Sequence, residues 1–302
     1  MKKLIAIVFL IISSLSLYFF NADSKKLKIH VYQLKSADDD MLLGMAFPIS
    51  DKIAIMSYHQ YELSRDKMSL IAEDEREIPV KKIYAFPEID IVFISPCDGV
   101  NYFNDYYSLM NSDELHLGDN MFAVGVNRTI GSLPLITKGI FSGRTTKSLT
   151  GIFPVICSAI VSDARTNSGF SGGPLLDKNF NVVGMICGRI FPTPEEASIG
   201  AYSVPSNLIL RALESRGKKT FYYKDLRYEI RLKSPSKALY SLEAVVLENF
   251  NGVLLKDDVI KKVDNLCFYS ENDLDFILST SSGHVNFTII RNGTEHNLSV
   301  EN

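Results

Sequence analysis

Residues 169–175 read Gly169-Phe170-Ser171-Gly172-Gly173-Pro174-Leu175, a serine enclosed by glycines. Glycine has no Cβ, so it permits a tight turn that projects a serine hydroxyl away from the backbone. In such a turn the N–H groups of Gly169 and Ser171 point together at an oxyanion developing on a bound carbonyl. The stretch therefore predicts Ser171 as a nucleophile beside an oxyanion hole of two backbone N–H groups.

The chain on both sides of this turn is rich in short β-type segments. From about residue 27 to residue 202, runs of β-branched and aromatic residues are separated by glycine, proline, aspartate and asparagine. Examples are Lys28–Tyr32, Lys52–Met56, Ile89–Ile94, Asn120–Val124 and Asn181–Ile186. Many short strands at such spacing indicate an all-β sandwich or barrel.

The pattern changes after Pro205. Residues 206–214 carry apolar side chains at helical spacing and the segment stops near Gly217, which predicts a helix followed by a domain boundary. Beyond residue 222 the chain shows two or three strands and a short helix around residues 271–278. An Asn-Gly pair at positions 292 and 293 predicts a closing hairpin.

These segments resemble the HtrA/Deg family of trypsin-like serine proteases. The Ser171 turn looks like the nucleophile loop of chymotrypsin-type proteases, and Ile199–Asn207 resembles the family's closing "I-G-F-A-I-P-S-N". Leu117–Gly125 and Thr137–Ser142 are similar to its "G-D…A-I-G" and "T-x-G-I-V-S" stretches. The resemblance implies a mainly β fold, with a chymotrypsin-like double six-stranded β-barrel over 27–217 and a small PDZ-like α+β domain over 222–302.

A serine hydroxyl is a poor nucleophile at neutral pH and needs a general base, which itself needs an orienting acid. The resemblance implies the chain order His, Asp, Ser. His59 follows an apolar run, as in the family's "I-L-T-N-N-H-V", and is the predicted base, with His116 as the fallback. Asp90 heads an apolar strand like the family's "D-I-A-L-L-K-I" and is the predicted acid, with Asp98 as the substitute.

The chain departs from the family near the site. Phe170 stands where the family usually has Asn or Asp, and Ser57-Tyr58 replace two asparagines before the histidine. The backbone donors are unaffected by the first change, so catalysis is expected to survive it. By analogy the specificity pocket is lined by Arg165, Thr166 and Ala201, whereas relatives often favour small aliphatic residues.

The C-terminal segment Gly252–Asn265 resembles the PDZ sequence "G-L-x-x-G-D-x-I-x-x-V-N-G". A PDZ domain captures an extended C-terminus by adding it to a sheet edge. The resemblance therefore implies C-terminal peptides as partners, held near residues 228–230. The alternative is a packing domain that only positions the protease.

The N-terminus predicts export. Lys2 and Lys3 precede the apolar stretch Leu4–Phe20, and a polar segment follows. No A-x-A pattern marks a cleavage site, so two alternatives stay open: a signal peptide over 1–26, or an inner-membrane anchor formed by residues 4–20. Both place the remaining chain in the periplasm.

Charge and cysteine usage narrow the range of partners and cofactors. Lysine and arginine number 32 against 35 acidic residues, without a long run of one sign, so no nucleic-acid footprint is predicted. No C-x-x-C motif occurs, and we expect neither a metal nor an organic cofactor. The four cysteines are Cys97, Cys157, Cys187 and Cys267. Two alternatives remain for them: a Cys157–Cys187 disulfide, or buried free thiols.

Together these observations predict an exported serine endopeptidase that acts on polypeptides through an acyl-enzyme. Unfolded or damaged envelope proteins, or one regulatory membrane protein, are the expected substrates, and a trimer is implied by the family resemblance alone. The alternative is a protease-fold chaperone or peptide-sensing protein whose site is mostly inactive. Its expected sign is an oxyanion loop that is not formed.

Overall fold

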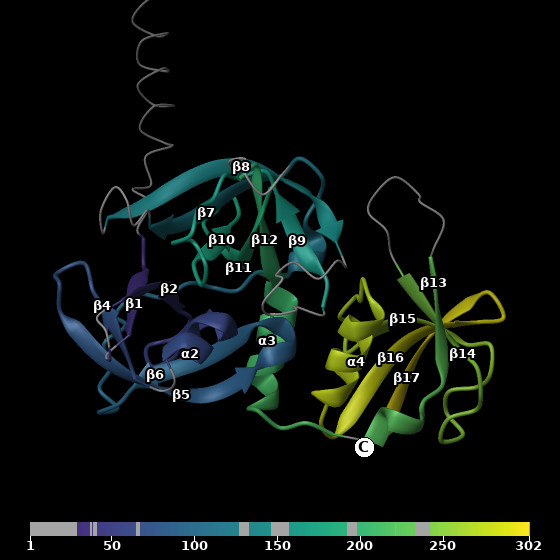
Figure 1. Ribbon diagram of the computed structural model, residues 1–302. Coiled ribbons are helices and arrows are strands. Elements are labelled where there is room, and N and C mark those ends of the chain that lie inside the picture. The colour runs from purple at the N-terminus through teal and green to yellow at the C-terminus, as the bar shows by residue number, and fades with distance from the viewer. Residues whose placement is uncertain are drawn as a thin grey trace, which may run out of the picture.

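The computed structural model describes residues 29–36, 38, 41–64, 67–126, 133–145, 157–191, 198–220, 222–232 and 242–301. The predicted export segment, residues 1–26, lies outside these ranges. None of the described helices is long and apolar enough to cross a bilayer. The strands form two closed barrels and one open sheet (Figure 1).

The first barrel contains six strands in the order β1-β2-β3-β6-β5-β4. Their bounds are β1 (Tyr32–Ser36), β2 (Leu42–Pro48), β3 (Ala54–Ser57), β4 (Met68–Ile71), β5 (Glu77–Phe86) and β6 (Ile91–Pro96). In β5 the buried Ile78 and Val80 alternate with exposed neighbours, so one face of the strand packs into the barrel. β1 begins at Tyr32, later than the predicted Lys28–Tyr32, because pairing with β2 and β4 sets its limits.

The second barrel has six strands in the order β10-β11-β12-β9-β8-β7. Their bounds are β7 (Asn120–Val126), β8 (Pro134–Thr145), β9 (Ala159–Ser162), β10 (Pro174–Leu176), β11 (Val182–Ile190) and β12 (Gly200–Pro205). Its core includes the buried side chains of Met121, Phe141 and Leu175. The two barrels confirm the predicted mainly β, double six-stranded fold.

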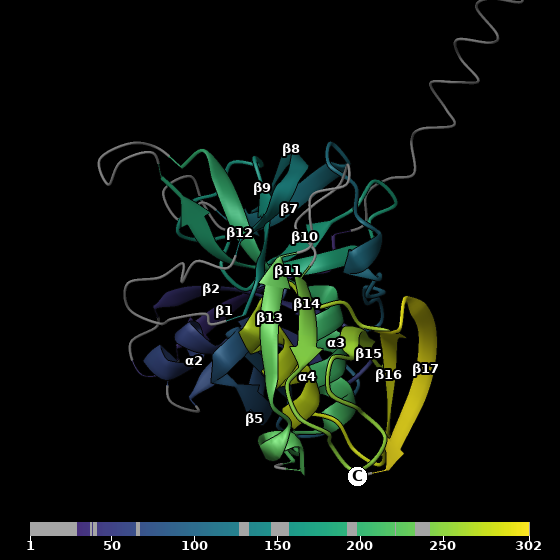
Figure 2. The same cartoon turned by 90° about the vertical axis from the view of Figure 1, so that its right-hand side faces the viewer.

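The C-terminal part is a five-stranded sheet in the order β13-β14-β15-β16-β17 with one helix packed on it (Figure 2). The strands are β13 (Tyr228–Leu232), β14 (Leu242–Val246), β15 (Val259–Val263), β16 (His284–Arg291) and β17 (Thr294–Glu301), and the helix is α4 (Glu271–Ser279). Asn292 and Gly293 have φ values of 51° and 78°, as the predicted tight hairpin requires.

The predicted helix over residues 206–214 is α3 (Ser206–Ser215), which lies between the barrels and the C-terminal sheet (Figure 1). Arg211 of α3 forms an ion pair of 3.1 Å with Asp264 of the C-terminal part and donates to the Ile277 carbonyl over 3.3 Å. The predicted domain limit at 217 falls just after α3, and the limit at 222 is the first residue of the short helix η3 (Tyr222–Asp225).

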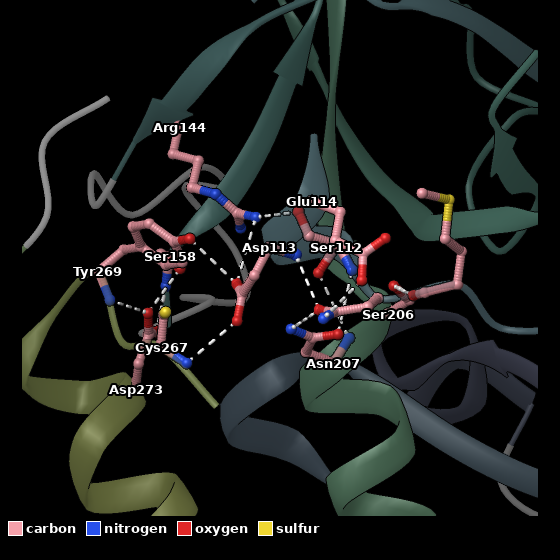
Figure 3. Close-up of polar contacts among 12 residues, drawn as sticks. Ser112, Asp113, Glu114, Arg144, Ser158, Ser206, Asn207, Cys267, Tyr269 and Asp273 are labelled. Carbon is pink, nitrogen blue, oxygen red and sulfur yellow. Dashed lines mark hydrogen bonds and ion pairs between the residues drawn. The ribbon is translucent and has the colours of Figure 1, made fainter. Parts of the chain in front are cut away.

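A polar network joins the second barrel to the C-terminal part (Figure 3). Asp113, in the short helix η2 (Ser112–Glu114), accepts from the Tyr269 hydroxyl and the Cys267 N–H, both over 3.0 Å. Arg144 of β8 lies over the Tyr269 ring, with Cζ 4.0 Å from the centroid. The pairing of a cation with an aromatic face and a carboxylate stabilises this contact.

Asp273 is a buried carboxylate of this network, with 1% of its surface exposed. Its carboxylate accepts from the Ser158 N–H over 2.7 Å, the Ser158 hydroxyl over 2.6 Å and the Tyr269 N–H over 2.9 Å. Ser158 immediately precedes β9, whereas Asp273 lies in the first turn of α4. One side chain therefore joins the second barrel to the C-terminal helix.

Replacing Asp273 by alanine is expected to lower the free energy of unfolding by about 3 kcal/mol, because two buried donors and one partly buried donor lose their acceptor. A urea titration followed by circular dichroism measures the change. Glu271→Ala, an exposed change on the same helix, is the control and is expected to cost less than about 1 kcal/mol. Equal urea midpoints for the two variants would contradict the assignment.

Candidate active site

The Ser171 turn leaves no room for side chains on its glycines. A Cβ at Gly169 would lie 2.1 Å from the Val126 carbonyl oxygen, and one at Gly172 would lie 2.1 Å from that of Met45. Gly172 also has a φ of +78°, a left-handed conformation that favours glycine. Backbone crowding from both barrels therefore requires the glycines that enclose Ser171.

The turn is attached to the first barrel through Ser171 itself. Its carbonyl oxygen accepts from the Met45 N–H of β2 over 3.0 Å. Ser171 precedes β10 of the second barrel, so the predicted nucleophile lies where the two barrels meet.

His59 and Asp90 form a hydrogen-bonded pair in the first barrel. Asp90 Oδ2 lies 2.8 Å from His59 Nδ1, and Asp90 Oδ1 accepts from the His59 backbone N–H, also over 2.8 Å. A carboxylate only accepts, so Nδ1 carries the proton and Nε2 is left as the basic nitrogen. This is the tautomer that a general base for a serine hydroxyl needs.

Local backbone geometry sets the position of each partner. His59 lies in the first turn of α2 (Tyr58–Ser64), directly after β3, and Asp90 ends the short helix η1 (Pro87–Ile89) before β6. Asp90 adopts a left-handed conformation with φ of 56°, which aspartate tolerates better than most residues. With only 2% of its surface exposed, Asp90 is shielded from water against the imidazole.

The oxyanion loop differs from its predicted geometry. The Gly169 N–H donates to the Asn167 carbonyl over 2.9 Å, and the Phe170 N–H donates to the same oxygen over 3.1 Å. The bond from Gly169 closes a three-residue turn inside the loop. The predicted pair of N–H donors from Gly169 and Ser171 is therefore not assembled in this conformation, and rotation of the Ser168–Gly169 peptide would be needed to free the first donor.

The three predicted specificity residues do not lie together. Thr166 is buried and its hydroxyl donates to the Gly200 carbonyl over 3.3 Å, next to the buried Ala201 of β12. Arg165 is exposed instead. Successive residues of an extended segment point to opposite sides, so burial of Thr166 turns Arg165 toward solvent.

The fallback residues are not placed for catalysis. The His116 side chain is 81% exposed and lies beside Asp119. Asp98 accepts from the Tyr102 hydroxyl over 2.7 Å, and that hydrogen bond lowers the pKa of the Asp98 carboxyl. Within the described ranges, no group of three His, Cys, Asp or Glu side chains is arranged to hold a metal ion.

All four cysteines are free thiols, so the Cys157–Cys187 disulfide is not formed. Cys157 and Cys187 are buried, with sulfur contacts to the Asn272 and Tyr202 carbonyls over 3.7 and 3.5 Å. Burial, with a smaller contribution from the negative charge of Asp90, raises the pKa of Cys187. Cys187 is therefore a neutral thiol behind the acid, a neighbour that the sequence did not indicate.

Two further neighbours of the site came only from the structure. Ser57 Oγ lies 3.4 Å from His59 Nε2, and the buried Gln60 side chain reaches the Ser171 carbonyl. Both residues flank His59 in the sequence, but a strand-to-helix turn leaves open which way such side chains point. The only available signal was that Ser57-Tyr58 departs from the family's two asparagines.

Comparisons with known proteins agree with this architecture. A family model described as a trypsin-like peptidase domain matches residues 53–185. A probable periplasmic serine endoprotease, DegP-like, of Pseudomonas putida (strain W619) is 28% identical over 278 residues, which are 85% of this chain and 55% of the relative. The periplasmic pH-dependent serine endoprotease DegQ of Escherichia coli (strain K12) is 31% identical over 144 residues, covering 47% and 30%.

Solved structures show the same fold. An HtrA-type protease, AlgW with tripeptide, superposes with a TM-score of 0.57 at 21% identity, covering 90% of this chain and 92% of that one. A serine endoprotease from Yersinia pestis gives a TM-score of 0.54 at 16% identity, covering 93% and 96%. The chain spans about half the length of the first curated relatives that it matches.

Proposed function

We propose that the chain is a member of the HtrA/Deg-type trypsin-like serine proteases, to which it is similar, and that it is a serine endopeptidase that cleaves polypeptides through an acyl-enzyme. One observation carries the proposal. Asp90 holds His59 in the basic tautomer, while the next residue, Gln60, bonds to the carbonyl of Ser171. The consecutive residues His59 and Gln60 therefore link the acid of the first barrel to the backbone of the proposed nucleophile in the second.

In the proposed reaction Ser171 Oγ attacks the scissile carbonyl carbon and its proton passes to His59 Nε2. The C–N bond then breaks, the proton moves from His59 to the leaving amine, and an ester to Ser171 remains. Water attacks this ester, gives a proton to His59, and the C–Oγ bond breaks as Ser171 recovers its proton. Asp90 stabilises the imidazolium in both halves and keeps its own charge.

Stabilisation of the oxyanion is assigned to the N–H groups of Gly169 and Ser171. The Gly169 donor becomes available when its bond to the Asn167 carbonyl opens. Binding of substrate or of an activating peptide would drive that rotation, because a bound carbonyl oxygen offers the N–H a better acceptor. Removing one oxyanion donor costs about 100- to 1000-fold in kcat in serine proteases, so this loop decides how active the resting protein is.

We assign the protein to the periplasm and its substrates to unfolded or damaged envelope proteins, or to one regulatory membrane protein. The relatives named as periplasmic proteases support the location. Anchoring by residues 4–20 and a trimeric assembly are part of the proposal and rest on the sequence. Thr166 and Ala201 are proposed to line the specificity pocket. Arg165 is left out because it is exposed.

The C-terminal unit is proposed as a PDZ-like domain that takes C-terminal peptides. β13 pairs with β14 on one side and forms an edge of the sheet in the described part of the chain. The Tyr228 hydroxyl of β13 donates to Asp275 of α4, so strand and helix face each other as the two walls of a groove would. An added peptide strand would pair with this edge.

The proposed function is tested by labelling the purified protein with a fluorophosphonate and by following casein degradation. We expect casein cleavage, and peptide mapping should find the label on Ser171 alone. Ser142→Ala, an exposed serine of β8, is the matched control and should be labelled like the parent. Label on other serines, with no cleavage, would contradict the proposal.

A second candidate, a chaperone or peptide sensor with a mostly inactive site, is favoured by the engaged Gly169 N–H. The same assay separates the two when C-terminal peptides are added. If Ser171 is labelled and casein is cut only with peptides, the protein is a peptide-activated protease. If Ser171 stays unlabelled in every condition, the result favours the chaperone or peptide sensor over the protease.

A further inference from the structure

Gln60 connects the base-bearing helix to the nucleophile. It follows His59 in α2 and is 1% exposed. Its Nε2 donates to the Ser171 carbonyl over 2.8 Å and to the Leu43 carbonyl over 3.2 Å. Because both partners are carbonyl oxygens, the nitrogen end of the amide must be the end that faces them.

The surrounding backbone is shaped around this amide. A Cβ at Gly44 would lie 1.8 Å from Gln60 Nε2, and one at Gly172 would lie 2.7 Å from Gln60 Oε1. The Gln60 side chain thus occupies the space between two glycines, one from β2 and one from the nucleophile turn. A side chain of this length fits only because neither neighbour carries a Cβ.

The Ser171 carbonyl receives both of its hydrogen bonds from the first barrel. One comes from the Met45 N–H and the other from Gln60 Nε2. The Gly172 N–H of the same peptide donates to the Ile186 carbonyl over 2.9 Å, so the Ser171–Gly172 peptide is held at both of its polar groups. Since this backbone places the Ser171 Cβ, from which Oγ extends, Gln60 adds a restraint on the proposed nucleophile from the helix that carries His59.

We propose that Gln60 is a positioning residue that fixes Ser171 relative to His59 across the barrel junction. The kinetic consequence rests on the proposed function, whereas the structural consequence does not. Misplacing reacting groups by about 1 Å costs on the order of 100-fold in rate. Loss of the Gln60 amide should therefore lower kcat and leave KM nearly unchanged, because substrate binding does not involve this buried side chain.

The test uses Gln60→Met, which keeps the length of the side chain and removes both donations. Ser64→Ala is the matched control, because the buried Ser64 hydroxyl donates to carbonyls of its own helix, those of Gln60 and Tyr61, over 3.3 and 3.0 Å. We expect Gln60→Met to slow fluorophosphonate labelling of Ser171 roughly 10- to 100-fold. Ser64→Ala should label at the parental rate.

Hydrogen exchange of the peptide covering residues 167–173 gives a readout that needs no activity. The Gly172 and Gly173 amides donate to the Ile186 and Phe170 carbonyls, both over 2.9 Å, so they begin protected. Gln60→Met should speed their exchange about tenfold, and Ser64→Ala should not. If this peptide exchanged at the same rate in Gln60→Met as in the parent protein, the proposal would be overturned. If Ser171 of the parent is not labelled and casein is not cleaved, the proposed function fails. The hydrogen-exchange comparison still decides whether Gln60 holds the Ser171 turn.

Gln60→Glu supplies a second variant of nearly identical shape. Its carboxylate faces two carbonyl oxygens, so it repels them when ionised and donates to one when protonated. Burial raises the pKa of such a carboxyl, so exchange relative to the parent should be fast near about pH 8 and approach parity near about pH 5. Comparison with the parent at each pH removes the pH effects that both proteins share. Equal ratios at both pH values would show that the donor does not hold Ser171.

Discussion

Ser171→Ala is expected to lower kcat for casein or a peptide substrate by about a millionfold, the loss found when a serine protease is deprived of its nucleophile. The change removes the hydroxyl oxygen that forms the acyl bond in the proposed mechanism. The fold is expected to persist, because the turn is held through the Ser171 carbonyl and the Met45 N–H, which alanine retains. The thermal midpoint should therefore stay within a few degrees of the parent value.

The measurement is kcat with a fluorogenic peptide, alongside the thermal midpoint of each variant. Ser142→Ala is the control for the loss of a serine hydroxyl elsewhere on the second barrel. A Ser171→Ala protein that kept more than about one hundredth of the parental rate would place the nucleophile elsewhere.

Asp90→Asn is expected to lower kcat by about ten-thousandfold while leaving the local geometry in place. Asparagine retains an oxygen for the His59 N–H, which Asp90 now accepts over 2.8 Å. Its NH₂ group, however, would donate to Nδ1 and shift the ring proton to Nε2. His59 would then present a proton to Ser171 where it must accept one.

Two measurements separate this effect from unfolding. The imidazole N–H signals of His59 in an NMR spectrum should move from Nδ1 to Nε2, and kcat should fall with little change in the thermal midpoint. Asp98→Asn, in an exposed turn, is the control and should keep parental activity. A fall in kcat below about tenfold for Asp90→Asn would remove Asp90 from the role of acid.

Much of the site could be predicted because its signals are local. The glycines around Ser171 indicate a tight turn. His59 directly follows one apolar run, and Asp90 directly precedes another. The helix over 206–214 and the Asn292-Gly293 hairpin follow from periodicity and from backbone preference. Such features depend on neighbours within a few residues, so the sequence carries them directly.

Other features of the site depend on which distant segments meet. The Gln60 amide bonds to a carbonyl 111 residues away, and Ser158 bonds to Asp273 over a separation of 115 residues. The direction of the Gly169 N–H and the exposure of Arg165 follow from how the loop packs, not from which residues it contains.

From the sequence by itself, propensity and spacing predicted the many short strands before Pro205 and the strands and helix of the C-terminal part, because they encode short-range structure. The family resemblance, also read from the sequence, added the double-barrel class and the predicted order His59, Asp90, Ser171. The tertiary structure alone decided that Gln60 touches the nucleophile, that the Gly169 N–H is engaged within its own loop, and that Asp273 joins the helix α4 to the second barrel. A hydrogen bond needs its donor and acceptor placed within a few tenths of an ångström. Only the packed barrels fix side chains that far apart in the sequence to that precision.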